Sequence, residues 1–273
     1  MCPINGTKVI FTNSCSGVRI HTHQIREVDI MNGTYRRFAY DGTYEGFLCV
    51  AVKCINLRVV PERIFVSEGN ITGDDLLYVR TDLRIASEMH KFIGNRTSAQ
   101  MQQMVTDGFL TALPDREKLL ISFIAKGIKF GASVADDYDD LAVSRLHAAI
   151  LDLYREEQSY FVSTEFYKHN DILTASIEPR NYVLPVMKTD IIRKTDYADL
   201  MIFDRRHNMV LYKHEETDDI VDIRNLTLAV RNDLSRICDE LWTYLKEGRY
   251  CSTPYRFIGH GADRMERMWY VAV

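Results

Sequence analysis

The chain has 273 residues, of which 46% are hydrophobic, enough to fill the core of one large domain or two small ones. Its formal net charge of −4 excludes a generally basic nucleic-acid-binding surface, so any contact with nucleic acid must be confined to a local basic region. No run of about twenty apolar residues is present, and the start "MCPINGTKVIF" lacks the order of a signal peptide. We therefore expect a cytoplasmic protein with no membrane segment.

Residues 1–38 are expected to form a β-rich N-terminal extension, because short strand-like stretches such as "KVIF", "GVRIHT" and "YRRFAY" are separated by Asn, Ser and Gly. Four side chains in it are of the types that bind zinc, but their spacing is poor. They are Cys2, Cys15, His21 and His23. The six cysteines form no C-x-x-C pair, which favours reduced structural thiols. We expect neither a metal nor another cofactor.

The stretch "AYDGTYEGFLCVAVKCI" predicts a strand that ends at Tyr40, a tight turn, and a helix over about 43–57. Gly42 can adopt a positive φ, and Thr43 can cap the helix. The amide groups at such a helix start could hold an anion, although a capped helix start with no ligand is the more common arrangement. We assign this stretch as a structural motif, whose residues are Tyr40, Asp41, Gly42, Glu45 and Gly46.

The middle of the chain is expected to be helical. Helical spacing of apolar residues occurs at 79–93, 98–113 and 114–131, and the last segment begins at a proline and ends near Gly131. The longest amphipathic pattern covers 136–161. Its buried face is predicted to consist of Leu146, Ile150, Leu153 and Phe161.

After this segment, the spacing of apolar residues changes from that of a helix to that of strands. Two strands are predicted in 162–179 and two more in 199–215, which makes an antiparallel sheet plausible. A final helix over about 226–246 is predicted to bury Leu234, Ile237, Leu241 and Leu245. We therefore predict an α+β fold with a helical middle and an antiparallel sheet from the second half. The main domain is expected to cover 39–250, followed by an Arg- and aromatic-rich tail at 251–273.

Several motifs in this order resemble one known family. They are "YDGTYEGFLCVAV", "AVSRLHAAILDLYREEQSYFVSTEFYK", "LTASIEPRNYVLPVM", "LMIFDRRHNMVLYK" and "ELWTYL". Together they resemble an uncharacterised bacterial family assigned to DNA repair or DNA metabolism. Its members are encoded beside a radical S-adenosylmethionine protein, and the same domain occurs fused to uracil-DNA glycosylases. The resemblance covers about residues 39–246 and implies a role in DNA metabolism with that radical protein as partner, but it assigns no catalytic residue.

Three side chains are candidates for acid–base catalysis. They are Glu178, Asp204 and His147, which would serve a nucleic-acid-processing enzyme such as a nuclease or a glycosylase-like protein. Structural roles are the favoured interpretation for Glu178, at a turn after a strand, and for His147, at a packed helix edge. The chain lacks a C-x-x-x-C-x-x-C motif and a Walker loop, so it is neither the iron–sulfur radical enzyme nor a nucleotide hydrolase of that type.

The segment "FDRRHN" is the strongest electrostatic feature. Arg205 and Arg206 in this hairpin could present guanidinium groups to phosphate. An equally supported interpretation is a solvated turn in which Asp204 caps the chain and Asn208 takes a left-handed conformation. Further candidate nucleic-acid contacts are Arg145, Arg256, Arg264 and Arg267. The alternative for Arg145 is a structural role, in which it forms an ion pair with Asp139 or Asp140.

Two functions remain open at this stage. The preferred one is an accessory protein of DNA metabolism that binds DNA or the radical S-adenosylmethionine protein. The alternative is the nucleic-acid-processing enzyme with the three candidate acid–base groups in one cleft. The tail either docks on the partner or adds an edge strand to the protein's own sheet, and its sequence favours the strand slightly.

Overall fold

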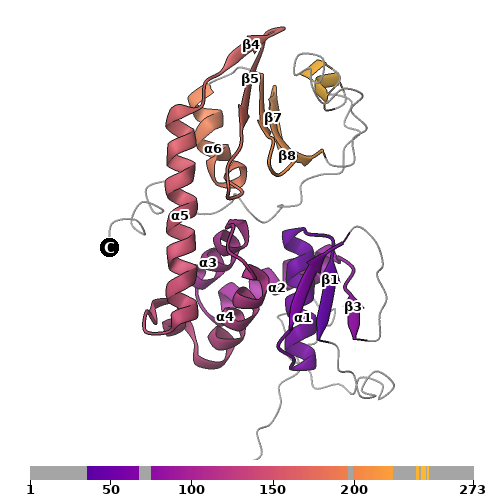
Figure 1. Cartoon of the computed structure of the whole chain (residues 1–273), viewed down its shortest axis with the longest axis vertical. Helices are drawn as coiled ribbons and strands as arrows, with labels where there is room; N and C mark the ends of the chain where they lie inside the picture. Colours follow the sequence, from indigo (N-terminus) through magenta and orange to yellow (C-terminus); the bar gives the residue numbers. More distant parts are fainter. Residues whose placement is uncertain are drawn as a thin grey trace, which may run out of the picture. The chain divides into compact units, whose positions relative to one another are not determined.

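The structure is a computed structural model that describes residues 36–67, 75–195 and 199–223, together with residues 238, 239, 241–243 and 245 of a further helical segment. The chain divides into two compact units (Figure 1). The first comprises residues up to Val105 and the segment Pro114–Ser144, and the second comprises Thr106–Leu113 and the chain from Arg145 onward. The possible zinc ligands and most of the expected N-terminal extension lie outside the described residues.

A small parallel sheet and one crossover helix open the first unit. The strands β1 (Arg37–Tyr40), β2 (Arg63–Val66) and β3 (Leu76–Tyr78) are arranged in the order β2-β1-β3. The helix α1 (Tyr44–Leu57) connects β1 to β2. The strand ending at Tyr40 and the helix that follows it are confirmed. β1 forms part of this sheet, so the predicted strand "YRRFAY" is not confined to an N-terminal extension.

The remaining helices of this part of the chain lie close to their predicted positions. They are α2 (Leu83–Arg96), α3 (Ala99–Leu110) and α4 (Arg116–Phe130), and a short 3-10 helix that was not predicted, η2 (Ala132–Asp136), follows α4. Asp82 caps α2, because its carboxylate accepts hydrogen bonds from the amides of Arg84 and Ile85. α4 ends at Gly131, whose φ of 87° a residue with a side chain rarely adopts.

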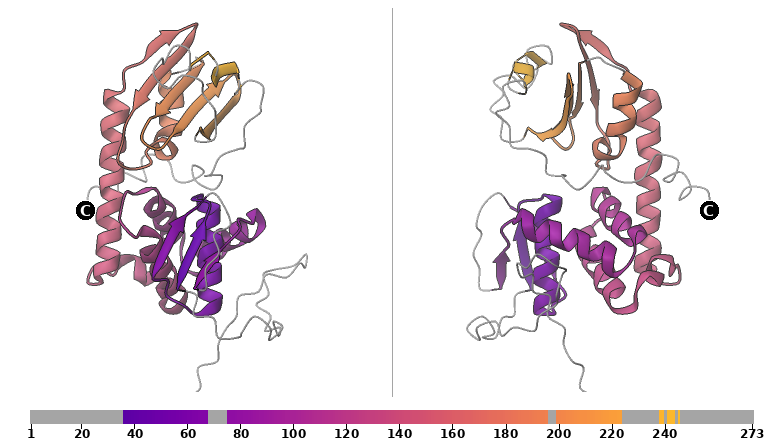
Figure 2. Two further views of the ribbon diagram at one scale, coloured as in Figure 1. Left: turned by 45° about the vertical axis from the view of Figure 1, so that its right-hand side comes forward. Right: turned by 180° about the vertical axis from the view of Figure 1, so that it is seen from behind.

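The second unit is built on a sheet of five strands. Following α5 (Leu141–Ser163), the chain forms β4 (Tyr167–His169), β5 (Ile172–Ile177), α6 (Leu184–Thr195), β6 (Leu200–Asp204), β7 (Met209–His214) and β8 (Thr217–Asp222). The strands lie in the order β4-β5-β6-β7-β8. Figure 2 shows α5 and α6 on one side of this sheet and the described residues of 238–245 on the other.

The prediction of a wholly antiparallel sheet is wrong at one position. β5 and β6 are parallel, whereas the other neighbouring pairs are antiparallel. The reason is α6, which carries the chain back across the sheet between these two strands and was not predicted. Proline at its second position does not prevent the helix, because the first turn needs no amide donor from that residue. The fold is therefore mixed α/β.

The C-terminal helical segment packs on the sheet through apolar side chains. Cys238, Leu241 and Leu245 form one cluster with strand residues that include Met201 and Tyr212. The predicted burial of Leu241 and Leu245 is confirmed. The predicted core residues Leu234 and Ile237, and the tail with Arg256, Arg264 and Arg267, lie outside the described residues. In the part of the chain that the structure describes, no helix is both long enough and apolar enough to cross a bilayer.

Candidate nucleic-acid interface

Two arginines project from the turn between β6 and β7. Arg205 and Arg206 are exposed, and neither forms an ion pair with any residue that the structure describes. We call the segment Asp204–Asn208 the arginine turn. An arginine without a carboxylate partner keeps its planar set of donors available for an anion such as phosphate.

A buried carboxylate holds the arginine turn in place. Asp204 is 1% exposed, and its Oδ1 accepts hydrogen bonds from the amides of Arg206 (3.1 Å) and His207 (3.0 Å). Its Oδ2 lies 2.6 Å from Nδ1 of His207. Asn208 has a φ of 55°, the left-handed conformation predicted from the sequence. The turn is thus fixed by its own side chains while both arginines point outward.

An aromatic contact joins the arginine turn to the loop after β5. The ring of Tyr182 stacks on the ring of His207 with centroids 3.9 Å apart and an angle of 29° between the planes. A backbone hydrogen bond also joins the arginine turn to the end of β5, because the amide of Arg205 donates to the carbonyl of Ile177 at 3.0 Å. The loop and the turn therefore lie at one end of the parallel strand pair.

Glu156 of α5 anchors that loop. Its two carboxylate oxygens accept hydrogen bonds from the amides of Arg180 (2.7 Å) and Asn181 (2.8 Å). The guanidinium of Arg180 pairs with Asp152 at 3.0 Å, so this arginine is already engaged with a carboxylate. Asn181 is 1% exposed, and its Oδ1 accepts from the amide of Ala112 at 2.7 Å. The loop is held by α5 on one side and by the chain after α3 on the other.

The structure brings two of the three candidate acid–base residues to one place. Ile177 and Asp204 are paired at the C-terminal ends of the parallel strands β5 and β6. Glu178, the residue after β5, therefore lies at the same end of the sheet as Asp204. Burial raises the pKa of Tyr160 there, and the charges of Glu156, Asp204 and Glu178 raise it further, although a hydrogen bond with the backbone of Glu178 lowers it.

His147 is not part of this group. It lies on α5 nine residues before Glu156, a separation of about 14 Å along the helix axis. Asp204 has both oxygens engaged by the arginine turn. Among the described residues, no group of three or more His, Cys, Asp or Glu side chains is arranged to hold a metal ion.

Arg145 is exposed on the same helix. Asp140, one of the two carboxylates considered as its partner, is instead bound by Lys126 and accepts hydrogen bonds from the first amides of α5. The hydrogen bond from Lys126 is also the main reason why the pKa of Asp140 is lowered. The structure therefore leaves Arg145 without the Asp140 ion pair and about 16 Å along α5 from Glu156.

At the start of α1, side chains of the protein itself form hydrogen bonds with the groups that an anion could otherwise contact. Asp41 Oδ1 accepts from the amide (3.0 Å) and the hydroxyl (2.7 Å) of Thr43, and Oδ2 accepts from the hydroxyl of Thr81 (2.6 Å). Thr43 in turn accepts from the amide of Gly46 at 2.9 Å. A Cβ on Gly46 would collide with Asp41. These contacts favour the structural role over anion binding, because a carboxylate of the protein already occupies the helix start.

Comparison with known families gives one match. The sequence profile of the domain of unknown function DUF4130 matches residues 114–270, more than half of the chain. The chain belongs to the DUF4130 family. Searches of curated proteins and of solved structures found no significant match. The DUF4130 match includes α4, α5, the five-stranded sheet and the whole arginine turn, whereas the motif at Tyr40–Gly46 precedes it.

Three aromatic or imidazole groups of the candidate site were not predicted as site residues. His207 stood in the segment "FDRRHN", but its contacts with Asp204 and Tyr182 depend on the pairing of β5 with β6. Tyr182 and Tyr160 come from a loop and from α5. The available sequence signal was an aromatic residue three positions after the Glu-Pro that ends a strand.

Proposed function

We propose that this protein binds DNA through the arginine turn, as an accessory protein of DNA metabolism. The observation that supports the proposal is a pair of adjacent, exposed guanidinium groups with no described carboxylate partner, on a turn fixed by buried Asp204. Guanidinium groups match the geometry of phosphate oxygens. Such contacts position a protein on nucleic acid without reading its sequence.

A fixed turn also lowers the cost of binding. Ordering flexible groups at an interface reduces affinity, and the arginine turn is already held by Asp204 and by the stacked rings of His207 and Tyr182. The formal net charge of −4 means that such a local basic group, and not a general positive surface, must supply the attraction.

The test is a double variant, Arg205→Ala with Arg206→Ala. Each phosphate contact releases counterions, so the loss of both arginines should weaken binding and flatten the log–log salt dependence by up to about one unit per contact. Affinity for a DNA oligonucleotide is measured by fluorescence anisotropy at several salt concentrations. An unchanged melting temperature shows that the fold is intact.

The matched control is Arg84→Ala with Arg96→Ala, which removes the same charge from exposed positions of α2. The proposal requires the control to keep both the affinity and the salt slope of the wild type. Equal losses in both double variants would mean that net charge alone matters. Wild-type protein without salt-dependent DNA affinity would refute direct DNA binding.

We further propose that the protein works with a radical S-adenosylmethionine protein. This rests on the family resemblance of its motifs between residues 39 and 246. Co-purification of the two proteins tests it, with full-length chain and with a chain truncated after Lys246. If the tail is the interface, the truncated chain keeps its melting temperature and fails to co-purify. Failure of the full-length chain to co-purify would refute the partnership.

A further inference from the structure

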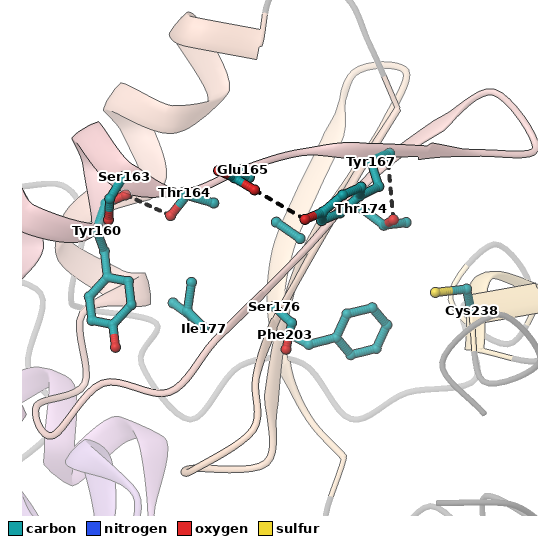
Figure 3. A pocket seen from close by; sticks show the side chains of 11 residues that line it. Tyr160, Ser163, Thr164, Glu165, Tyr167, Thr174, Ser176, Ile177, Phe203 and Cys238 are labelled. Carbon is teal, nitrogen blue, oxygen red and sulfur yellow. Dashed lines mark hydrogen bonds between the residues drawn. The ribbon is translucent and has the colours of Figure 1, made fainter. Parts of the chain in front are cut away.

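A cavity of about 330 Å³ lies on the second unit, along β5 and the end of α5 (Figure 3). Strand residues line one part of it, with Thr174 and Ser176 from β5 and Phe203 from β6. Tyr160, at the end of α5, and Tyr167, on β4, line another part. None of these residues except Tyr160 contributes to the interface described above.

Two paired strands lead from the lining of the cavity to the arginine turn. Ser176 pairs with Phe203, and the next pair is Ile177 with Asp204, the first residue of the arginine turn. Along β6, Phe203 and Arg205 are two residues apart, about 7 Å of strand. A ligand in the cavity therefore lies next to a group that binds phosphate in the proposed function.

Among the residues that the structure describes, the lining of the cavity includes no cation. The charged residue among them is Glu165, whose carboxylate accepts a hydrogen bond from the hydroxyl of Tyr167 at 3.1 Å. Cys238 at the opposite side is uncharged at neutral pH, because burial raises the pKa of its thiol to about 11. A cavity with one carboxylate and no positive group disfavours phosphate and sulfate.

The other lining groups suit a planar, neutral molecule with polar edges. The rings of Tyr167 and Tyr160 offer flat apolar surfaces, and Phe203, which is 6% exposed, closes the cavity toward the apolar core. The hydroxyl of Ser176 forms no hydrogen bond with a described residue and can donate or accept. Thr174 donates its hydroxyl to the carbonyl of Tyr167 at 3.1 Å and keeps an oxygen free to accept. Nucleobases have this combination of a stacking face and hydrogen-bonding edges.

We propose that the cavity receives one unstacked base of a single-stranded nucleic acid whose backbone contacts the arginine turn. The proposal rests on the proposed function and adds the ligand class, which is a single strand and not a duplex. A base in a duplex is stacked between its neighbours and cannot enter the cavity. The protein should therefore bind a single strand more tightly than the duplex of the same sequence.

The test fills the cavity with Ser176→Phe. Ser176 is exposed on the sheet, so a larger side chain there occupies the cavity without entering the core. The control is Thr217→Phe, the same kind of change at an exposed position of β8. The probe is a single-stranded DNA oligonucleotide with one 2-aminopurine, whose fluorescence falls when the base stacks on an aromatic ring.

We expect wild type and Thr217→Phe to quench the probe and to prefer it over the duplex. Ser176→Phe should lose the quenching and about tenfold in affinity for the single strand, since stacking of one base on an aromatic ring contributes on that order. Its salt slope should be unchanged, because the arginine turn is intact. Thr174→Val, which replaces one hydroxyl by a methyl group, provides a second variant should Ser176→Phe lower the melting temperature.

The outcomes separate this inference from the proposed function. Salt-dependent binding that is lost on removal of Arg205 and Arg206, with equal affinity for single strand and duplex, would refute the base-binding cavity and leave the arginine turn as a DNA contact. An unchanged affinity of folded Ser176→Phe for the single strand would also refute it. Absence of salt-dependent binding in the wild type would refute the proposed function itself.

Discussion

Single carboxylates fix two separate turns in this protein. Asp41 binds the amide and hydroxyl of Thr43 at the start of α1, and Asp204 binds two amides of the arginine turn. An aspartate in such a position replaces a backbone turn by accepting amide hydrogens that would otherwise be unpaired. The difference lies in what each turn exposes, because only the second one carries exposed arginines next to it.

The glycine after Asp41 allows a prediction about stability. Gly42 has a φ of 84°, and a Cβ there would lie 2.7 Å from a methyl carbon of Val66. Gly42→Ala should therefore lower the free energy of unfolding by more than the roughly 1 kcal/mol that the left-handed conformation alone costs. Chemical denaturation of the purified variant measures the change.

Gly131 supplies the matched control for this substitution. Among the described residues other than its chain neighbours, no heavy atom lies within 4 Å of the position of a Cβ on Gly131. Its φ of 87° and ψ of −163° lie in a region that is essentially restricted to glycine, so Gly131→Ala should lose stability through the backbone conformation alone, without a collision. An unchanged stability of Gly42→Ala would contradict the structural role of the turn.

At the level of helices, strands and turns, the sequence correctly predicted the elements that are marked by capping residues or turn residues. Thr43 caps α1 as expected, and Gly131 ends α4. Asn208 has the left-handed conformation given by one of the two interpretations of its turn. These features depend on residues within one turn of each other, so the chain order alone carries the information.

The missed elements depend on distant partners. β2 and β3 have four and three residues, and their side chains are at most half-buried, so no alternation marks them. α6 was not predicted, and neither was the parallel pairing of β5 and β6 that follows from it. The candidate site depends on that pairing. "FDRRHN" was recognised, but the contacts with Tyr182 and the cavity beside Phe203 could not be derived from local pattern.

At the scale of the whole molecule, the order of the chain and the division into units do not coincide. The segment Thr106–Leu113 belongs to the second unit, although the chain on both sides of it belongs to the first. The amide of Tyr182 donates to the carbonyl of Leu110 at 2.9 Å, and Asn181 binds the amide of Ala112. The loop beside the arginine turn thus depends on a segment that precedes the DUF4130 match.

A buried hydrogen bond tests this dependence. The hydroxyl of Tyr154 on α5 donates to Oδ2 of Asp107 at 2.5 Å, and the two residues are 5% and 3% exposed. Tyr154→Phe removes this donor from a buried carboxylate, which should lower the free energy of unfolding by about 1–3 kcal/mol. Tyr167→Phe, at a residue that is 65% exposed, is the control and should change it by no more than about 0.5 kcal/mol.

The coupling between the two residues decides whether the bond itself is responsible. Asp107→Asn and Tyr154→Phe each disrupt the same contact, so their effects should not add in the double variant. Urea denaturation of the full-length wild type, both single variants and the double variant gives the coupling free energy. Additive effects would show that the segment before Pro114 does not stabilise α5 through this bond. A coupled loss, accompanied by weaker DNA binding in the single variants, would link Thr106–Leu113 to the stability of the arginine turn through Asn181 and Tyr182.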